Sequence, residues 1–112
     1  MGGRGSLRVA VVLAGSVAAG GAFAASGDDL VGRGRHIAEA ACSPCHAIDR
    51  EGPSATPEAP PFRELGRKYP VDSLQEALAE GVVVGHPGMP EVRMNETDIA
   101  AFLAWLKSAQ VP

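Results

Sequence analysis

The chain has 112 residues and a formal net charge of −3 at pH 7, with ten lysines and arginines against 13 aspartates and glutamates. This length suits one small domain. The acidic balance argues against a nucleic-acid partner, because nucleic acids attract basic surfaces.

Residues 1–24 have the layout of a secretory signal peptide. Arg4 and Arg8 form a basic start, Val9–Ala19 is apolar, and residues 22–24 form a small-x-small cleavage site. Cleavage there leaves residues 25–112, with eight basic and 13 acidic residues and a net charge of −5. The alternative is an uncleaved membrane anchor, but glycines interrupt the apolar stretch, and a spanning helix needs about 20 apolar residues. We therefore expect a periplasmic or otherwise exported protein with no stable membrane insertion after cleavage.

The first predicted element after this leader is a helix over Asp28–Ala41. Its apolar residues recur at helical spacing, and it runs directly into the next motif.

Residues 42–46 read Cys-Ser-Pro-Cys-His, the pattern of covalent c-type haem attachment. Two thiols three positions apart can each form a thioether with a vinyl group on one edge of the porphyrin. His46 then lies under the ring with an imidazole nitrogen directed at the iron. We therefore expect one haem c, covalently bound through Cys42 and Cys45, with His46 as an iron ligand. Both cysteines are used by the motif, so no disulfide is expected.

Two other uses of a Cys-x-x-Cys pair fit the sequence less well. A thioredoxin-like redox pair is expected in a βαβ context, which is not visible here. A structural zinc site needs four ligands, whereas Cys42, Cys45 and His46 provide three and the chain has no second cysteine pair.

A proline-rich loop over residues 49–61 separates the motif from the next helices. Phe62–Tyr69 is predicted as a short helix with Phe62 and Leu65 facing inward. Its other side carries basic residues, one of which could meet a haem propionate: Arg63, Arg67 and Lys68.

Two further helices are predicted, over Ser73–Glu80 and from Glu96 to about Ala109. Ser73 and Glu76 have the spacing of a capping box, and Gly81 is expected to end the first of these helices. Asn95 is the expected N-cap of the second. No segment shows sustained strand alternation, so we predict an all-α domain.

The loop over residues 81–90 is expected to complete the iron site. The candidates for the second axial ligand are His36, His86, Met89 and Met94. We favour Met89, because Gly88 lets the backbone approach the ring and Pro90 stiffens the loop. A thioether also stabilises ferrous iron. His86 is the main competitor, since imidazole binds haem iron well.

Together these features resemble the small, soluble, single-haem class I cytochromes c of bacteria, over essentially all of residues 25–112. Gly34 and Trp105 match the glycine and the aromatic residue at which the terminal helices of that family cross, and Met89-Pro90 matches its methionine-ligand motif. The resemblance implies a small all-α cytochrome c fold, with three to four helices and loops wrapped around one covalent haem.

The resemblance also implies a proline carbonyl that accepts the Nδ1 proton of the haem histidine. Residues 59–62, Ala-Pro-Pro-Phe, resemble the Gly-Pro segment that provides it, with alanine in place of glycine. Pro60 is therefore the expected partner of His46, with Pro53 as the alternative.

These expectations describe an electron-transfer protein rather than an enzyme. Ligation by His46 and Met89 leaves the iron no open position, so we expect a one-electron carrier between a redox donor protein and an acceptor protein. We expect it to be monomeric or transiently docked. The alternatives are a haem c subunit permanently docked to a larger dehydrogenase or oxidase, and a gas-binding or peroxidatic protein with a labile sixth ligand.

Overall fold

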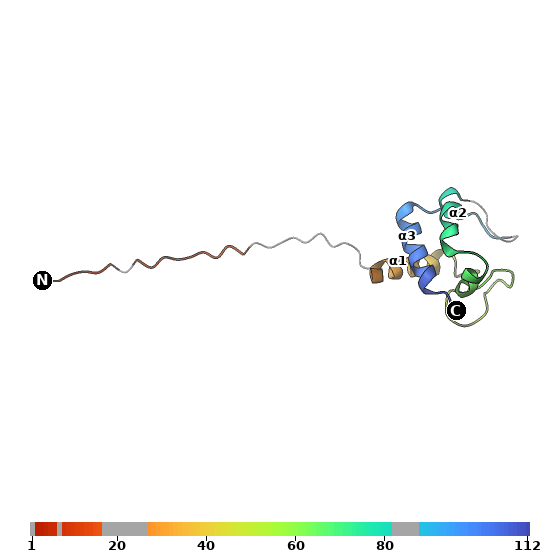
Figure 1. Cartoon of the computed structure of the whole chain (residues 1–112), viewed down its shortest axis with the longest axis horizontal. Coiled ribbons are helices and arrows are strands. Elements are labelled where there is room, and N and C mark those ends of the chain that lie inside the picture. Colours follow the sequence, from red (N-terminus) through yellow and green to blue (C-terminus); the bar gives the residue numbers. More distant parts are fainter. Residues whose placement is uncertain (1, 7, 17–26, 82–87) are drawn as a thin grey trace.

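The computed structural model describes residues 2–6, 8–16, 27–81 and 88–112. Residues 2–6 and 8–16 are exposed, have no regular secondary structure, and extend away from the folded part of the chain (Figure 1). The predicted signal-peptide cleavage site, and residues 82–87 of the predicted ligand loop with His86 among them, lie outside the described residues. No helix in the described ranges is both long and apolar enough to cross a membrane.

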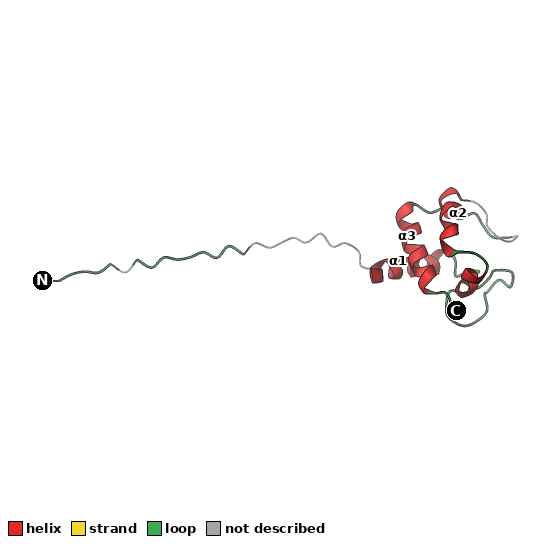
Figure 2. Cartoon of the chain, in the orientation of Figure 1, coloured by secondary structure: helices red, strands yellow, loops and turns green. Residues whose placement is uncertain are grey.

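The described part of the chain contains helices and loops and no strand (Figure 2), which confirms the predicted all-α class. Three α-helices are present: α1 (Gly27–Ala41), α2 (Leu74–Glu80) and α3 (Glu96–Ser108). Two short 3-10 helices, η1 (Phe62–Arg67) and η2 (Val71–Ser73), lie between α1 and α2.

Helix α3 begins and packs as its sequence predicts. The Asn95 side chain accepts a hydrogen bond of 2.8 Å from the backbone N–H of Asp98, which satisfies one of the unpaired donors in the first turn. The helix then buries an apolar face at helical spacing, which consists of Ile99, Phe102, Leu103 and Leu106. This face, together with Trp105, forms the centre of the core.

The predicted capping box at the start of α2 is wrong. Ser73 belongs to η2 and has helical dihedrals, with φ −67° and ψ −11°. Its hydroxyl donates to the carbonyl of Pro70 at 2.6 Å and makes no cap bond. An N-cap side chain reaches the first turn from an extended backbone, which the η2 turn does not allow. The other end of α2 is as predicted, because Gly81 adopts a left-handed φ of 77°.

The short helix predicted over Phe62–Tyr69 is a 3-10 helix that ends at Arg67. Phe62 and Leu65 are buried as expected. Because Pro61 precedes the helix and Pro70 follows it, the segment has room for only about two turns of the tighter helix.

Helices α1 and α3 cross in close contact (Figure 1), and Gly34 lies at the crossing. A Cβ added at Gly34 would overlap the carbonyl oxygen of Ala101 and would lie 2.7 Å from Trp105 Cβ. Only a glycine therefore allows this approach. An ion pair of 2.7 Å between Arg33 and Asp98 lies beside the crossing, but it is largely exposed and contributes little.

We predict that Gly34→Ala destabilises the haem-loaded protein by about 1–3 kcal/mol, because a methyl group at the crossing must push α1 and α3 apart. Gly32→Ala is the matched control: its added Cβ meets nothing within 4 Å, so the change should leave stability unchanged or raise it by up to about 1 kcal/mol. Denaturant unfolding followed by circular dichroism measures both. Equal effects of the two variants would contradict a close crossing at Gly34.

Candidate haem-binding site

The Cys-x-x-Cys-His motif forms a tight turn at the end of α1. The backbone N–H groups of Cys42 and Ser43 both donate to the carbonyl of Ala38 at 2.9 Å. The N–H groups of Cys45 and His46 then donate to the carbonyl of Cys42, at 3.1 and 2.9 Å. The helix therefore continues into a turn that presents both thiols and the imidazole from one short segment.

The Cys42 thiol is unsuited to thioredoxin-like chemistry. The two cysteines are not bridged to each other. Burial raises the pKa of the Cys42 thiol to about 11. A redox dithiol depends on a cysteine whose pKa is lowered so that the thiolate is present at neutral pH. The environment of Cys42 has the opposite effect.

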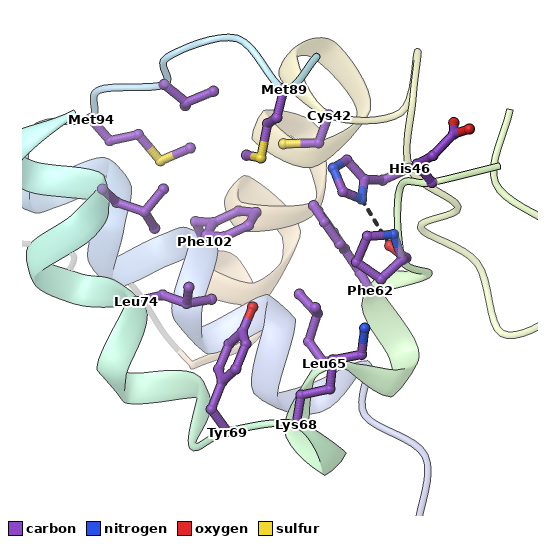
Figure 3. A pocket seen from close by; sticks show the side chains of 14 residues that line it. Cys42, His46, Phe62, Leu65, Lys68, Tyr69, Leu74, Met89, Met94 and Phe102 are labelled. Carbon is purple, nitrogen blue, oxygen red and sulfur yellow. Dashed lines mark hydrogen bonds between the residues drawn. The ribbon is translucent and has the colours of Figure 1, made fainter. Parts of the chain in front are cut away.

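The motif opens onto an apolar crevice made of two adjoining cavities, of about 240 and 110 Å³. Both cavities are bordered by Cys42, His46, Phe62, Met89 and Val92. The larger one extends between η1, α2 and α3 (Figure 3), and its apolar wall includes Leu65, Leu74, Leu78, Met94 and Phe102. The crevice thus lies between the Cys-x-x-Cys-His motif and the core face of α3.

His46 is held in place on two sides. It is 7% exposed, and its Nδ1 lies 2.8 Å from the carbonyl oxygen of Pro60. Its ring also packs on Phe62, with the ring centroids 4.5 Å apart. With Nδ1 in this hydrogen bond, Nε2 is the ring nitrogen that is left to bind a metal. Of the two prolines considered from the sequence, Pro60 is therefore the one whose carbonyl the His46 imidazole meets (Figure 3).

Of the candidates for the second axial ligand, His86 lies outside the described residues, and two of the other three border the crevice. Met89 borders both cavities, and its side chain lies at the same end of the crevice as those of Cys42 and His46 (Figure 3). Met94 borders the larger cavity farther away, and its backbone N–H donates to the carbonyl of Leu78 at 2.9 Å. His36 lies on an exposed face of α1, where it is 3.7 Å from Glu39.

The loop around Met89 has the backbone that its sequence indicates. Gly88 adopts a positive φ of 86°, a conformation that other residues rarely adopt. Pro90 follows Met89 and borders the smaller cavity. Gly88 therefore allows the turn before Met89, and Pro90 restricts the backbone conformation after it.

The three basic residues of the η1 region make different contacts. Arg63 donates to the carbonyl of Gly52 at 2.8 Å, and Arg67 donates to the carbonyl of Pro112 at 2.8 Å. Lys68 borders the larger cavity. Lys68 and Tyr69 lie at the end of the crevice opposite Cys42 (Figure 3).

Sequence reasoning gave Tyr69 no role, yet it borders the crevice and burial raises the pKa of its hydroxyl. The available signal was its spacing: in an α-helix over the predicted range Phe62–Tyr69, Tyr69 would share a face with Leu65, four residues earlier.

The residues around the crevice fit a covalently bound haem. Paired thiols, an imidazole with a fixed tautomer and a thioether surround one apolar space, which is the donor set of a c-type haem. The family model for cytochrome c matches residues 31–110, so the chain belongs to the cytochrome c family. Proteins of this family bind haem covalently and transfer electrons through it. No curated protein and no solved structure matches the chain.

We predict that the double substitution Cys42→Ser and Cys45→Ser abolishes covalent haem retention, because a hydroxyl cannot replace a thiol in the thioether bond. Haem staining of denaturing gels measures this. Ser43→Ala changes a residue between the two cysteines without removing a thiol, so it should retain haem. Covalent haem in the double variant would contradict the assignment of the motif.

Proposed function

We propose that this protein is an exported, diffusible one-electron carrier with a single haem c, attached through Cys42 and Cys45, and with His46 and Met89 as the axial ligands. When bound, the haem iron supplies a reversible one-electron change between the ferric and ferrous states. The observation that supports this proposal most directly is that Cys42, His46 and Met89 meet at one end of the same apolar crevice.

The protein's own residues would set the properties of the iron site. The Pro60 carbonyl holds the Nδ1 proton of His46, which fixes the ring orientation and makes Nε2 a stronger donor. The Met89 thioether favours ferrous iron and raises the reduction potential. Apolar walls from Phe62, Leu65 and Phe102 limit access of water. Two protein ligands leave no position for a substrate, which favours electron transfer over gas binding or peroxidatic chemistry.

Lys68 and Tyr69 are suited to the propionate edge of the haem. The vinyl and propionate groups lie on opposite edges of a porphyrin, and Lys68 and Tyr69 border the end of the crevice opposite Cys42. A cation and a hydroxyl there can pair with a carboxylate.

The surface and the leader sequence support transient docking outside the cytoplasm. Residues 25–112 carry 13 acidic against eight basic residues, so long-range attraction favours basic donor and acceptor proteins. The basic start, the apolar stretch and the small-x-small site of residues 1–24 support export.

We predict that the protein as isolated is low-spin, with a weak methionine-to-iron band at long wavelength, and that Met89→Ala abolishes this band and gives a high-spin spectrum. Met94→Leu is the matched control: it removes the other methionine of the crevice and should leave the band unchanged. His86→Ala should also retain it. Loss of the band in His86→Ala, or a high-spin spectrum before any substitution, would disprove ligation by Met89.

We predict that Lys68→Gln lowers the reduction potential by some tens of millivolts. A positive charge beside the haem favours the ferrous form, and partial exposure screens the effect. Lys107→Gln removes the same charge from the surface between α2 and α3, where Lys107 pairs with Asp72, and should change the potential much less. Spectroelectrochemical titration at neutral pH measures both. Equal shifts would show that only net charge matters.

A further inference from the structure

The side chain of Gln110, two residues beyond the end of α3, connects three backbone groups. Its Nε2 donates to the carbonyls of Phe62 and Leu106, at 2.7 and 2.9 Å. Its Oε1 accepts from the backbone N–H of Gly66 at 2.6 Å. Rotation of the amide by 180° would set oxygen against two carbonyls and NH₂ against an N–H. One orientation alone therefore satisfies all three contacts.

The η1 helix accommodates this amide through a glycine. A Cβ added at Gly66 would lie 2.9 Å from Gln110 Oε1 and 3.3 Å from its Cγ. Two other bonds connect the same parts of the chain: Val111 N–H donates to the carbonyl of Arg63 at 2.9 Å, and Arg67 donates to that of Pro112 at 2.8 Å. The C-terminal residues are thus held along the whole of η1.

Phe62 connects this C-terminal contact to the His46 imidazole. Its carbonyl accepts the bond from Gln110, while its N–H donates to the carbonyl of Ala47 at 3.0 Å. Its ring lies against the His46 ring. The carbonyl that meets His46 Nδ1 belongs to Pro60, two residues earlier.

The short link between Phe62 and Pro60 is stiff. The Pro61 ring limits its own φ, which is −59°, and also restricts the backbone of Pro60 before it. Rotation about the Pro61 ψ is the main freedom left in this link, so fixing the backbone of Phe62 limits how far the Pro60 carbonyl can move.

We propose that Gln110 is a positioning residue for the iron ligand His46, acting through residues 60–66. This inference rests on the proposed function, because it takes His46 as a haem ligand. Gln110 holds the carbonyl of Phe62, the Pro60–Phe62 segment holds the His46 Nδ1 proton, and the imidazole is thereby kept in the orientation that iron binding requires.

The test is hydrogen exchange of the His46 Nδ1 proton in the haem-loaded protein, followed by NMR with ¹⁵N-labelled histidine. Gln110→Met keeps the length of the side chain and removes its hydrogen bonds. We expect exchange to become about tenfold faster, the factor that corresponds to about one net hydrogen bond. Gly66→Ala should also accelerate exchange, because its methyl group displaces the Gln110 amide.

Gln110→Glu gives a pH signature that a general loss of stability does not produce. The introduced carboxylate faces two carbonyls, which raises its pKa above the usual value of about 4.3. Above that pKa it cannot donate, and exchange should match that of Gln110→Met at the same pH. Below it, the protonated carboxyl donates to Phe62 and accepts from Gly66, and exchange should slow relative to Gln110→Met.

Arg67→Gln is the matched control, because it removes another bond between η1 and the C-terminal residues but leaves the Phe62 carbonyl paired. Its Nδ1 exchange should stay within about twofold of the unaltered protein, well under one hydrogen bond. If Gln110→Met accelerates the amides of α3 as much as the His46 proton, or leaves the His46 proton unchanged, the inference is overturned.

The same spectra separate this inference from the proposed function. In the ferric unaltered protein, the His46 ring protons should show the large paramagnetic shifts of an iron ligand. Their absence would overturn the proposed ligation. Their presence, together with unchanged Nδ1 exchange in Gln110→Met, would overturn only the role of Gln110.

Discussion

The close crossing of α1 and α3 at Gly34 is the contact on which the haem crevice depends. It sets the distance between the end of α1, which carries Cys42, and the face of α3 that carries Phe102. A side chain at position 34 would have to displace the backbone of Ala101, which belongs to a regular helix and cannot move alone. The lack of a side chain at Gly34 therefore sets the width of the crevice, although Gly34 itself does not line the crevice.

Phe62 has a similar importance on the other side of the crevice. Its ring contacts His46 at 4.5 Å between centroids, and Phe102 and Trp105 at 5.9 and 6.1 Å. It therefore joins the His46 imidazole directly to the aromatic cluster at the helix crossing. Because its backbone is also bonded to Ala47 and Gln110, the ring is fixed by main-chain contacts as well as by packing.

The sequence predicted the ends of helices correctly where a single residue sets the backbone conformation. Asn95 caps α3 and Gly81 ends α2, because a side-chain acceptor and a left-handed φ are properties of single positions. The capping box at Ser73 failed because Pro70 starts a 3-10 turn there, and its carbonyl takes the serine hydroxyl. The correct caps and the failed capping box all have local causes. The failure depends on the Pro70 carbonyl, which competes for the Ser73 hydroxyl and is not revealed by the spacing of Ser73 and Glu76.

The sequence by itself indicated the kind of cofactor and the motif expected to attach it, because Cys42, Cys45 and His46 lie within five residues and one turn brings them together. It also indicated the helices, whose periodicity is local. Only the tertiary structure decided which groups surround the motif. Pro60 meets His46 from 14 positions away, and Gln110 meets Phe62 from 48 positions away. Lys68 and Tyr69 border the crevice from the segment after η1, and Met89 borders it from the loop before α3. These long-range contacts depend on how the helices cross and on the paths that the loops take between them. The spacing of residues within one segment does not contain that information.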